Sequence, residues 1–345
     1  MTAALTDPGP PDVRVGLSRR LTATVVALAG VAVACLVSLM IGNQALSPGT
    51  VLRALWSDES SGARDIVRGL RMDRTIIGVA VGLALGAAGA LMQALARNPL
   101  ADPGLLGVNA GAAAAIVTGI AVLHVESPHV QIWFAFAGAA AASLAVYVLG
   151  SGGRSSTTPL RLALAGAALS AVLAAYVNGI ALSSQPAFDK MRFWLVGSLV
   201  GQDLSVLVDA LPFLALGLVA ALVITPALNA MALGEDSGRA LGVNIGRLRL
   251  VTAAAITLLC GTATAIAGPI VFLGLVVPHI ARFVVGPDQR WVVPLSMLYS
   301  AILLLLADTV GRVVTRDEVE AGIMTAFLGA PVFIALVRRR RLAHL

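Results

Sequence analysis

Two adjoining stretches of the chain decide its fold class. Positions 75–96 read TIIGVAVGLALGAAGALMQALA, and positions 97–111 read RNPLADPGLLGVNAG. The first stretch is long enough to cross a bilayer as a helix, because about 20 apolar residues suffice. Its Gly82, Gly86 and Gly89 recur at nearly helical spacing, and small residues at such spacing let membrane helices approach each other closely.

The second stretch predicts where the next helix starts. Asp102 followed by Pro103 is typical of a helix N-terminus, with an acid as the N-cap and a proline in the first turn. We therefore expect two membrane helices joined by a short ordered connection.

The composition extends this prediction to the whole chain. Of the 345 residues, 58% are apolar and 12% are charged, against about 25% charged residues in soluble domains. These values exclude a soluble globular enzyme, a disordered chain and an ordinary nucleic-acid binder. We predict an all-α, polytopic membrane protein with a flexible tail at 1–17 and one domain at 18–341. Ten apolar runs predict its transmembrane helices, at 21–42, 75–96, 105–123, 130–150, 160–182, 206–228, 249–267, 269–285, 291–308 and 321–337.

The distribution of charge predicts the orientation. With ten spans, one set of loops carries 15 basic against six acidic residues, and the other set carries nine basic against twelve acidic residues. The basic set is expected on the cytoplasmic side. Both termini then lie in the cytoplasm, and Arg338–Arg341 anchors the C-terminal end.

The chain carries no signature of catalysis. Its only lysine, Lys190, precedes Met191, so it has no Gly-Lys-Ser/Thr phosphate-binding loop. If ATP drives this protein, a partner must hydrolyse it. Cys35 and Cys260 lie in apolar runs and the four histidines are scattered, so we predict no metal site.

Two local patterns stand out beyond topology. In the loop 229–249, Glu235 and Asp236 predict the first turn of a short helix, where the helix dipole favours acids, and Gly242 predicts its end. This loop is either a solvated connector or a rigid docking element. Asp308 and Arg312 lie four residues apart near the end of a span, a spacing that favours an ion pair on one helix face.

The stretch 97–111 closely resembles the permease subunits of bacterial ABC importers for ferric siderophores and cobalamin. The likeness covers about residues 20–341, and among members the chain looks most like the ferric-enterobactin permeases. Further matching strings lie at 234–250, 267–279, 307–312 and 325–331. One departure occurs at 70–74, which reads Leu-Arg-Met-Asp-Arg where the family usually has Leu-Arg-Leu-Pro-Arg.

The resemblance implies a type II ABC importer permease fold in a bacterial cytoplasmic membrane. It implies a second permease subunit, for which we expect a related rather than identical chain. It also implies two ATPase subunits, which bind ATP and magnesium, and an extracytoplasmic siderophore-binding protein. This chain would contact lipid but bind no nucleic acid, hold no cofactor of its own and perform no catalysis.

The resemblance also implies roles for particular residues. Arginines of the outer face would receive acidic groups of the binding protein, the loop 229–249 would couple to the ATPase, and a re-entrant segment at 183–205 would border the translocation path. The docking residues are Arg71, Arg74 and Arg312, the coupling residues are Gly234, Glu235, Arg239, Leu241 and Gly242, and the path residues are Ser198 and Gln202.

Two alternatives remain open at this point. A permease of the same family for cobalamin or haem is one of them. The other is a secondary carrier, which would need ion-coupling groups or broken-helix repeats within its spans. The spans lack the acidic or histidine ligands that a bare ion would need, which favours a bulky, already chelated substrate.

Overall fold

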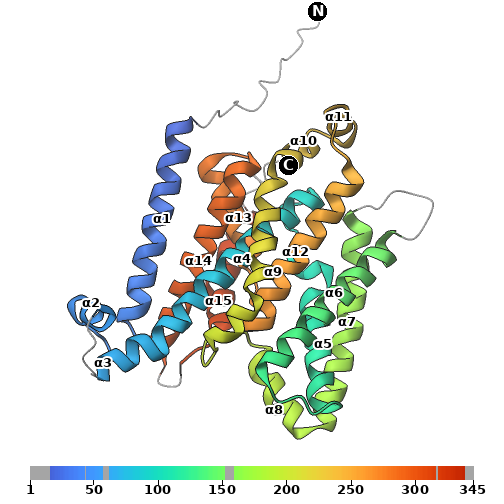
Figure 1. Ribbon diagram of the computed structural model, residues 1–345. Helices are drawn as coiled ribbons and strands as arrows, with labels where there is room; N and C mark the ends of the chain where they lie inside the picture. The colour runs from blue at the N-terminus through green and yellow to red at the C-terminus, as the bar shows by residue number, and fades with distance from the viewer. Residues whose placement is uncertain (1–15, 43, 57–61, 152–158, 316–317, 339–345) are drawn as a thin grey trace, which may run out of the picture.

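The computed structural model describes residues 16–42, 44–56, 62–151, 159–315 and 318–338, and the regular elements in these ranges are all helical (Figure 1). The elements are α1 (Leu17–Met40), α2 (Pro48–Trp56), α3 (Gly62–Arg64), η1 (Asp65–Arg71), α4 (Met72–Ala96), η2 (Pro103–Leu106), α5 (Val108–Ala121), α6 (Pro128–Ser151), α7 (Pro159–Ser183), α8 (Gln185–Trp194), α9 (Leu204–Val223), α10 (Thr225–Ala232), α11 (Glu235–Ala240), α12 (Ile245–Ala267), α13 (Leu273–Val285), α14 (Gln289–Val314) and α15 (Ala321–Arg338). The predicted all-α class is confirmed.

Each of the ten predicted spans overlaps helical structure. Within the described ranges, seven helices are long and apolar enough to cross a membrane, and three shorter apolar helices lie at Val108–Ala121, Leu273–Val285 and Ala321–Ala335. Because these three are shorter than the roughly 20 residues that a straight crossing needs, the number of ten crossings stays a prediction.

The structure refines three of the predicted boundaries. The run 206–228 divides into α9 and α10, and Pro226 lies at the start of α10, where proline is tolerated. Asp102 is an N-cap as predicted, since its carboxylate accepts from the Gly104 N–H at 2.7 Å, but it caps only the four-residue turn η2. Gly107, with a φ of 71°, separates this turn from α5. Helix α13 begins at Leu273, later than the predicted start at 269, and continues through Pro278 to Val285.

Two groups of short helices lie at opposite ends of the molecule. Helices α10 and α11 lie at the end where α1 begins, here called the α11 end (Figure 1). Helices α2, α3 and α8 lie at the opposite end, here called the α8 end (Figure 1). Helix α4 passes through the centre, and α5, α6 and α7 gather on the side away from α1.

Glycines let α4 occupy the centre of the bundle. In its apolar window 83% of the residues are buried, against 11% for α7. A Cβ at Gly82 would collide with the backbone of Ala301, one at Gly86 with the carbonyl of Ser296, and one at Gly89 with the backbone of Gly274. The predicted close approach at these glycines is confirmed, against α14 for the first two and against α13 for the third.

Replacing Gly86 with alanine is expected to destabilise the isolated permease by about 1–3 kcal/mol, since overpacking forces the backbones apart. Gly179→Ala on α7 is the matched control, because a Cβ there meets no atom within 4 Å. The control should be neutral or stabilising by up to about 1 kcal/mol. Unfolding in mixed micelles measures both variants, and equal stability would contradict the close approach of α4 and α14.

Candidate functional site

A buried carboxylate organises the α8 end. Asp308 of α14 is fully buried and accepts hydrogen bonds from Nε and Nη2 of Arg74, at 3.0 and 2.7 Å. It also accepts from Nε of Arg312 at 3.1 Å, so the predicted pair four residues apart is confirmed. Two guanidinium groups, from α4 and α14, therefore neutralise one carboxylate. A carboxylate removed from water needs such pairing, because an unpaired buried charge is very costly.

Two arginines bind the end of α1 at the same place. The last carbonyls of a helix lack intrahelical donors and carry partial negative charge, so cations there are favourable. Guanidinium N–H groups supply the missing donors at 2.5–3.2 Å. Arg312 donates to the carbonyls of Ser38 and Ile41, and Arg71 donates to those of Leu39, Met40 and Gln44.

The three predicted docking arginines border one cavity. Arg71, Arg74 and Arg312 line a cavity of about 350 Å³ at the α8 end, together with Glu318. The Glu318 carboxylate pairs with Nη1 of Arg74 at 2.8 Å, and its side chain is 27% exposed. Glu318 has a φ of 51°, a backbone conformation that non-glycine residues seldom adopt. The structure thus brings the three arginines together and places an internal acid among them.

The predicted path residues, Ser198 and Gln202, lie in a turn between α8 and α9 that hydrogen bonds connect to neighbouring helices. The Ser198 N–H donates to the Ala267 carbonyl at 2.8 Å, and the Gly322 N–H donates to the Gly197 carbonyl at 2.9 Å. Gln202 is close by, with its amide donating to the Ser198 carbonyl at 3.4 Å. The turn is therefore held between the end of α12 and the start of α15. The roles of Ser198 and Gln202 in translocation stay predictions.

Glycines delimit the short helix at the α11 end. Helix α11 covers Glu235–Ala240, as the acids in its first turn predict. Gly234 before it has a φ of 115°, and Gly242 after it has a φ of 83°. Both values favour glycine, because a side chain in this region clashes with the backbone. The chain can therefore enter and leave α11 through sharp turns.

Helix α11 has an exposed side and a side bound to the bundle. The Asp236 side chain is 99% exposed, and Leu241, directly after the helix, is 63% exposed. Glu235 instead pairs with Nη2 of Arg249 in α12 at 2.6 Å, and more loosely with Arg239 at 3.4 Å. Of the predicted coupling residues, Glu235 is therefore partly exposed and bound to α12, and the role of the set in coupling stays a prediction.

Helix α10, which precedes α11, is bound by a second carboxylate. Asp288 accepts from the Asn229 side chain of α10 at 2.6 Å and pairs with Arg20 of α1 at 3.4 Å. Burial raises the pKa of Asp288, but hydrogen bonds from Arg290 and Asn229 outweigh it and leave the pKa below its usual value. Asp288 thus joins α1, α10 and α14 as an anion.

The polar groups of the stretch 97–111 bind neighbouring elements. Arg97 donates to the Met231 carbonyl of α10 at 2.6 Å, the Pro99 carbonyl lies 2.8 Å from Nε2 of His279, and Thr264 donates to Asn109 at 2.8 Å. The polar residues of this stretch therefore stabilise the packing of the helices. The contact of Arg97, directly after α4, with Met231 joins α4 to α10.

Sequence reasoning missed Glu318, Arg249, Asp288 and Asn229. Their contacts with other elements join residues at least 14 positions apart, so local spacing gave no signal of them. For Glu318 the available signal was an acid following a span that carries Asp308 and Arg312. For Arg249 it was one of two arginines, with Arg247, at the start of the helix that follows an acidic turn.

Comparison with known proteins places these geometries in one family. The model of the FecCD transport family matches residues 28–339. The chain is 48% identical to the ferric enterobactin transport system permease protein FepD of Escherichia coli (strain K12), over 89% of this chain and 92% of that protein. It is 42% identical to the siderophore transport system permease protein YfiZ of Bacillus subtilis (strain 168), over 88% and 91%. Among solved structures, a metal-chelate type ABC transporter in an inward-facing conformation superposes with a TM-score of 0.81 at 26% identity, covering 92% of this chain and 99% of the other.

Replacing Arg312 with methionine should lower the free energy of unfolding by about 2–4 kcal/mol, because hydrogen bonds to the charged Asp308 carboxylate are lost. Asp308 then keeps only the guanidinium of Arg74, and the carbonyls at the end of α1 lose the N–H groups that Arg312 donates. Arg53→Met, at an exposed arginine of α2, is the control and should stay within about 0.5 kcal/mol. Denaturant titration of the isolated permease compares the two. If both variants unfold alike, the cluster around Asp308 does not hold the α8 end together.

Proposed function

Because the chain belongs to the FecCD transport family, we propose that it is the membrane permease subunit of an ATP-driven importer of ferric siderophores. The substrate assignment is supported by the likeness, along nearly the whole chain, to two permeases named for enterobactin and siderophore transport. This likeness favours a ferric siderophore over cobalamin or haem.

The energy enters through partner subunits. The chain has no phosphate-binding loop of the Gly-Lys-Ser/Thr type, so two ATPase subunits bind ATP and magnesium and hydrolyse the nucleotide. They bind at the α11 end, where Leu241, Asp236 and Arg239 are exposed. An exposed leucine beside charged groups suits a partner with an apolar cleft and a polar rim. Gly234 and Gly242 set the angles of α11.

A siderophore-binding protein docks at the α8 end. Arg71, Arg74 and Arg312 line the cavity there, and guanidinium groups pair well with carboxylates. Arg71 and Arg312 are occupied by α1 carbonyls and Asp308. Arg74 holds the exchangeable partner, Glu318, which is partly exposed. A carboxylate of the binding protein therefore replaces Glu318 on Arg74, while Arg71 and Arg312 shape the rim.

A second, related permease chain completes the channel, and Ser198 and Gln202 border the path of the chelate. The α11 end, where α1 begins, faces the cytoplasm of a bacterium. This orientation rests on the excess of basic residues in the loops of that side. A secondary carrier would use an ion gradient in place of the ATPases, and energy dependence separates the two classes.

Proteoliposomes that contain the complete complex test this function. With its partner permease, ATPases and binding protein, the chain should import ferric enterobactin only when ATP is supplied on the ATPase side. Import should survive an ionophore, and cobalamin and haem should not be imported. Purified alone, the chain should hydrolyse no ATP. Import that collapses with the ion gradient and ignores ATP would support the secondary carrier instead, and import of cobalamin alone would overturn the siderophore assignment.

Docking can be tested by a change that accelerates it. Glu318→Gln frees Arg74 and removes one negative charge from the cavity, so the binding protein should associate about threefold faster or more, since charges at an interface act mainly on association rate. Raised salt should slow association of the wild type. Surface plasmon resonance on the reconstituted complex measures both.

The matched control for this test is Asp65→Asn, which removes an exposed acid from η1 at the same end. It should change the association rate by less than about twofold. A faster rate cannot come from damage to the fold, which makes this variant more decisive than an arginine reversal. Rates indifferent to both salt and Glu318→Gln would place docking elsewhere.

A further inference from the structure

The ion pair between Glu235 and Arg249 connects the short helix at the α11 end to a membrane-spanning helix. Glu235 is the first residue of α11, and Arg249 lies in the second turn of α12. Their atoms Oε1 and Nη2 are 2.6 Å apart, and the Arg249 side chain is only 22% exposed. The looser partner, Arg239, is 60% exposed at 3.4 Å. Arg249 is therefore the better ordered of the two partners.

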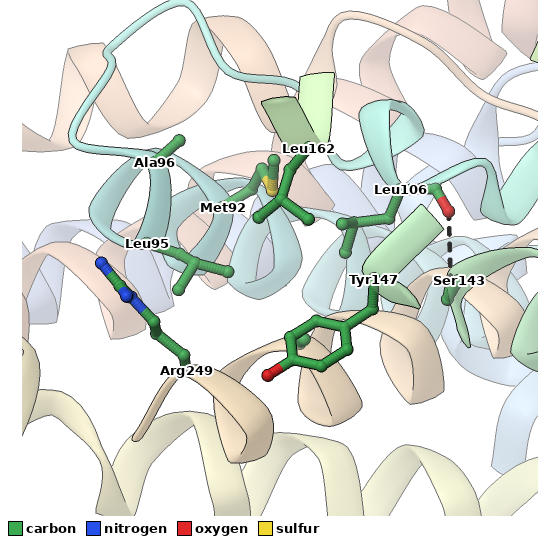
Figure 2. A pocket seen from close by; sticks show the side chains of 9 residues that line it. Met92, Leu95, Ala96, Leu106, Ser143, Tyr147, Leu162 and Arg249 are labelled. Atoms are coloured by element: carbon green, nitrogen blue, oxygen red, sulfur yellow. Dashed lines mark hydrogen bonds between the residues drawn. The ribbon is translucent and has the colours of Figure 1, made fainter. Parts of the chain in front are cut away.

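The Arg249 side chain also borders a cavity inside the bundle. The cavity is about 40 Å³ in volume, room for a few water molecules. Figure 2 shows Arg249 and Tyr147 on one side of this cavity and Met92, Ala96 and Leu162 on the other. Its walls thus come from α4, α6, α7 and α12. Protein interiors are normally close-packed, so an unfilled space beside an ion pair gives that pair room to move.

The other contacts of this region do not reach α12 in the same way. Helix α10 is bound to α4 through Arg97 and to α14 through Asp288. Among the ion pairs of the described residues, the one between Glu235 and Arg249 joins α11 to α12. Helix α11 also packs against α12 where Gly238 lies close to the Ile245 side chain. A push on the exposed side of α11 therefore reaches α12 through this packing and through the ion pair, which is the polar link between the two helices.

We propose that Arg249 is the positioning residue through which a displacement of α11 reaches α12, and that the adjoining cavity is the room in which α12 shifts against α4. This inference rests on the proposed function, in which ATPase subunits bind at the α11 end. Glu235 then works inside the permease, through Arg249, whereas Leu241 and Asp236 meet the ATPase.

Charge exchange in the complete transporter tests the ion pair. The readout is the amount of ferric enterobactin imported per ATP hydrolysed, measured in proteoliposomes together with co-purification of the ATPase. Glu235→Arg and Arg249→Glu should each lower this ratio about tenfold, because each puts like charges in contact, while ATPase still co-purifies. The double exchange should recover the ratio to within about threefold of the wild type. Arg19→Met, at an exposed arginine of α1 at the same end, is the control and should leave the ratio unchanged.

Filling the cavity supplies a second test that does not touch the ion pair. Ala253→Leu occupies the cavity and should reduce import per ATP about fivefold, since overpacking restricts movement of the walls. Ala254→Leu adds the same volume on the exposed side of α12 and should have no effect. Leu241→Asp should act differently, by abolishing co-purification of the ATPase.

Three results would overturn the proposal. The first is that the single charge exchanges leave the import per ATP unchanged. The second is that the double exchange lowers the import per ATP as much as the single exchanges do. The third is that Ala253→Leu gives the same import per ATP as Ala254→Leu. The wild-type complex checks the proposed function separately. If the wild type imports with ATP and the variants match it, the link through Arg249 is wrong and the function stands.

Discussion

The fully buried carboxylate of Asp308 is the constraint on which the α8 end depends. A carboxylate at this depth requires opposite charge, and two guanidinium groups from α4 and α14 supply it. Once Arg312 is held there, its remaining N–H groups face the end of α1 and satisfy carbonyls that the helix leaves open. The buried carboxylate of Asp308 thus connects α1, α4 and α14 through Arg74 and Arg312. The Nη1 atom of Arg74 pairs with a more exposed carboxylate, that of Glu318.

Helix α4 connects this cluster to the opposite end of the bundle. It carries Arg74 in its first turn and ends at Ala96, directly before Arg97, which binds α10. Glycines let it lie directly against α13 and α14, where a larger side chain would separate the helices. The helix therefore runs as one closely packed element from the α8 end toward the α11 end. Glycine turns with positive φ bound α11, and a small cavity lies beside Arg249.

Much of this architecture could be predicted from the sequence because the membrane simplifies the problem. Each long apolar run became a helix, and the acids and glycines around 234–242 predicted α11 almost to the residue. The helices α2 and α3 were not predicted, because their segment is short and depends on a small separate core formed by Val51, Ala54 and Val67. Periodicity carries no information about such packing.

In the candidate sites, too, the sequence predicted which residues group together but not the contacts that depend on packing. The sequence grouped Arg71, Arg74 and Arg312 correctly, yet gave no sign that two of them would be needed for the carbonyls of α1. Asp73, the departure from the family motif, lies in the first turn of α4, where an acid suits the helix dipole. Glu318 and Arg249 escaped notice because their partners are distant in sequence, and only the packed structure reveals which nitrogen of Arg74 pairs with Glu318.

The central claim is that the Asp308 cluster is a permanent frame and the contact between Arg74 and Glu318 is the one that docking exchanges. A cryo-electron microscopy structure of the complete complex with its binding protein bound, at a resolution that shows side chains, tests this claim most directly. The account predicts that Asp308 still accepts from Arg74 and Arg312, while Nη1 of Arg74 has left Glu318 for a carboxylate of the binding protein. A bound complex in which Glu318 keeps Arg74, or in which Asp308 has lost Arg312, would contradict it.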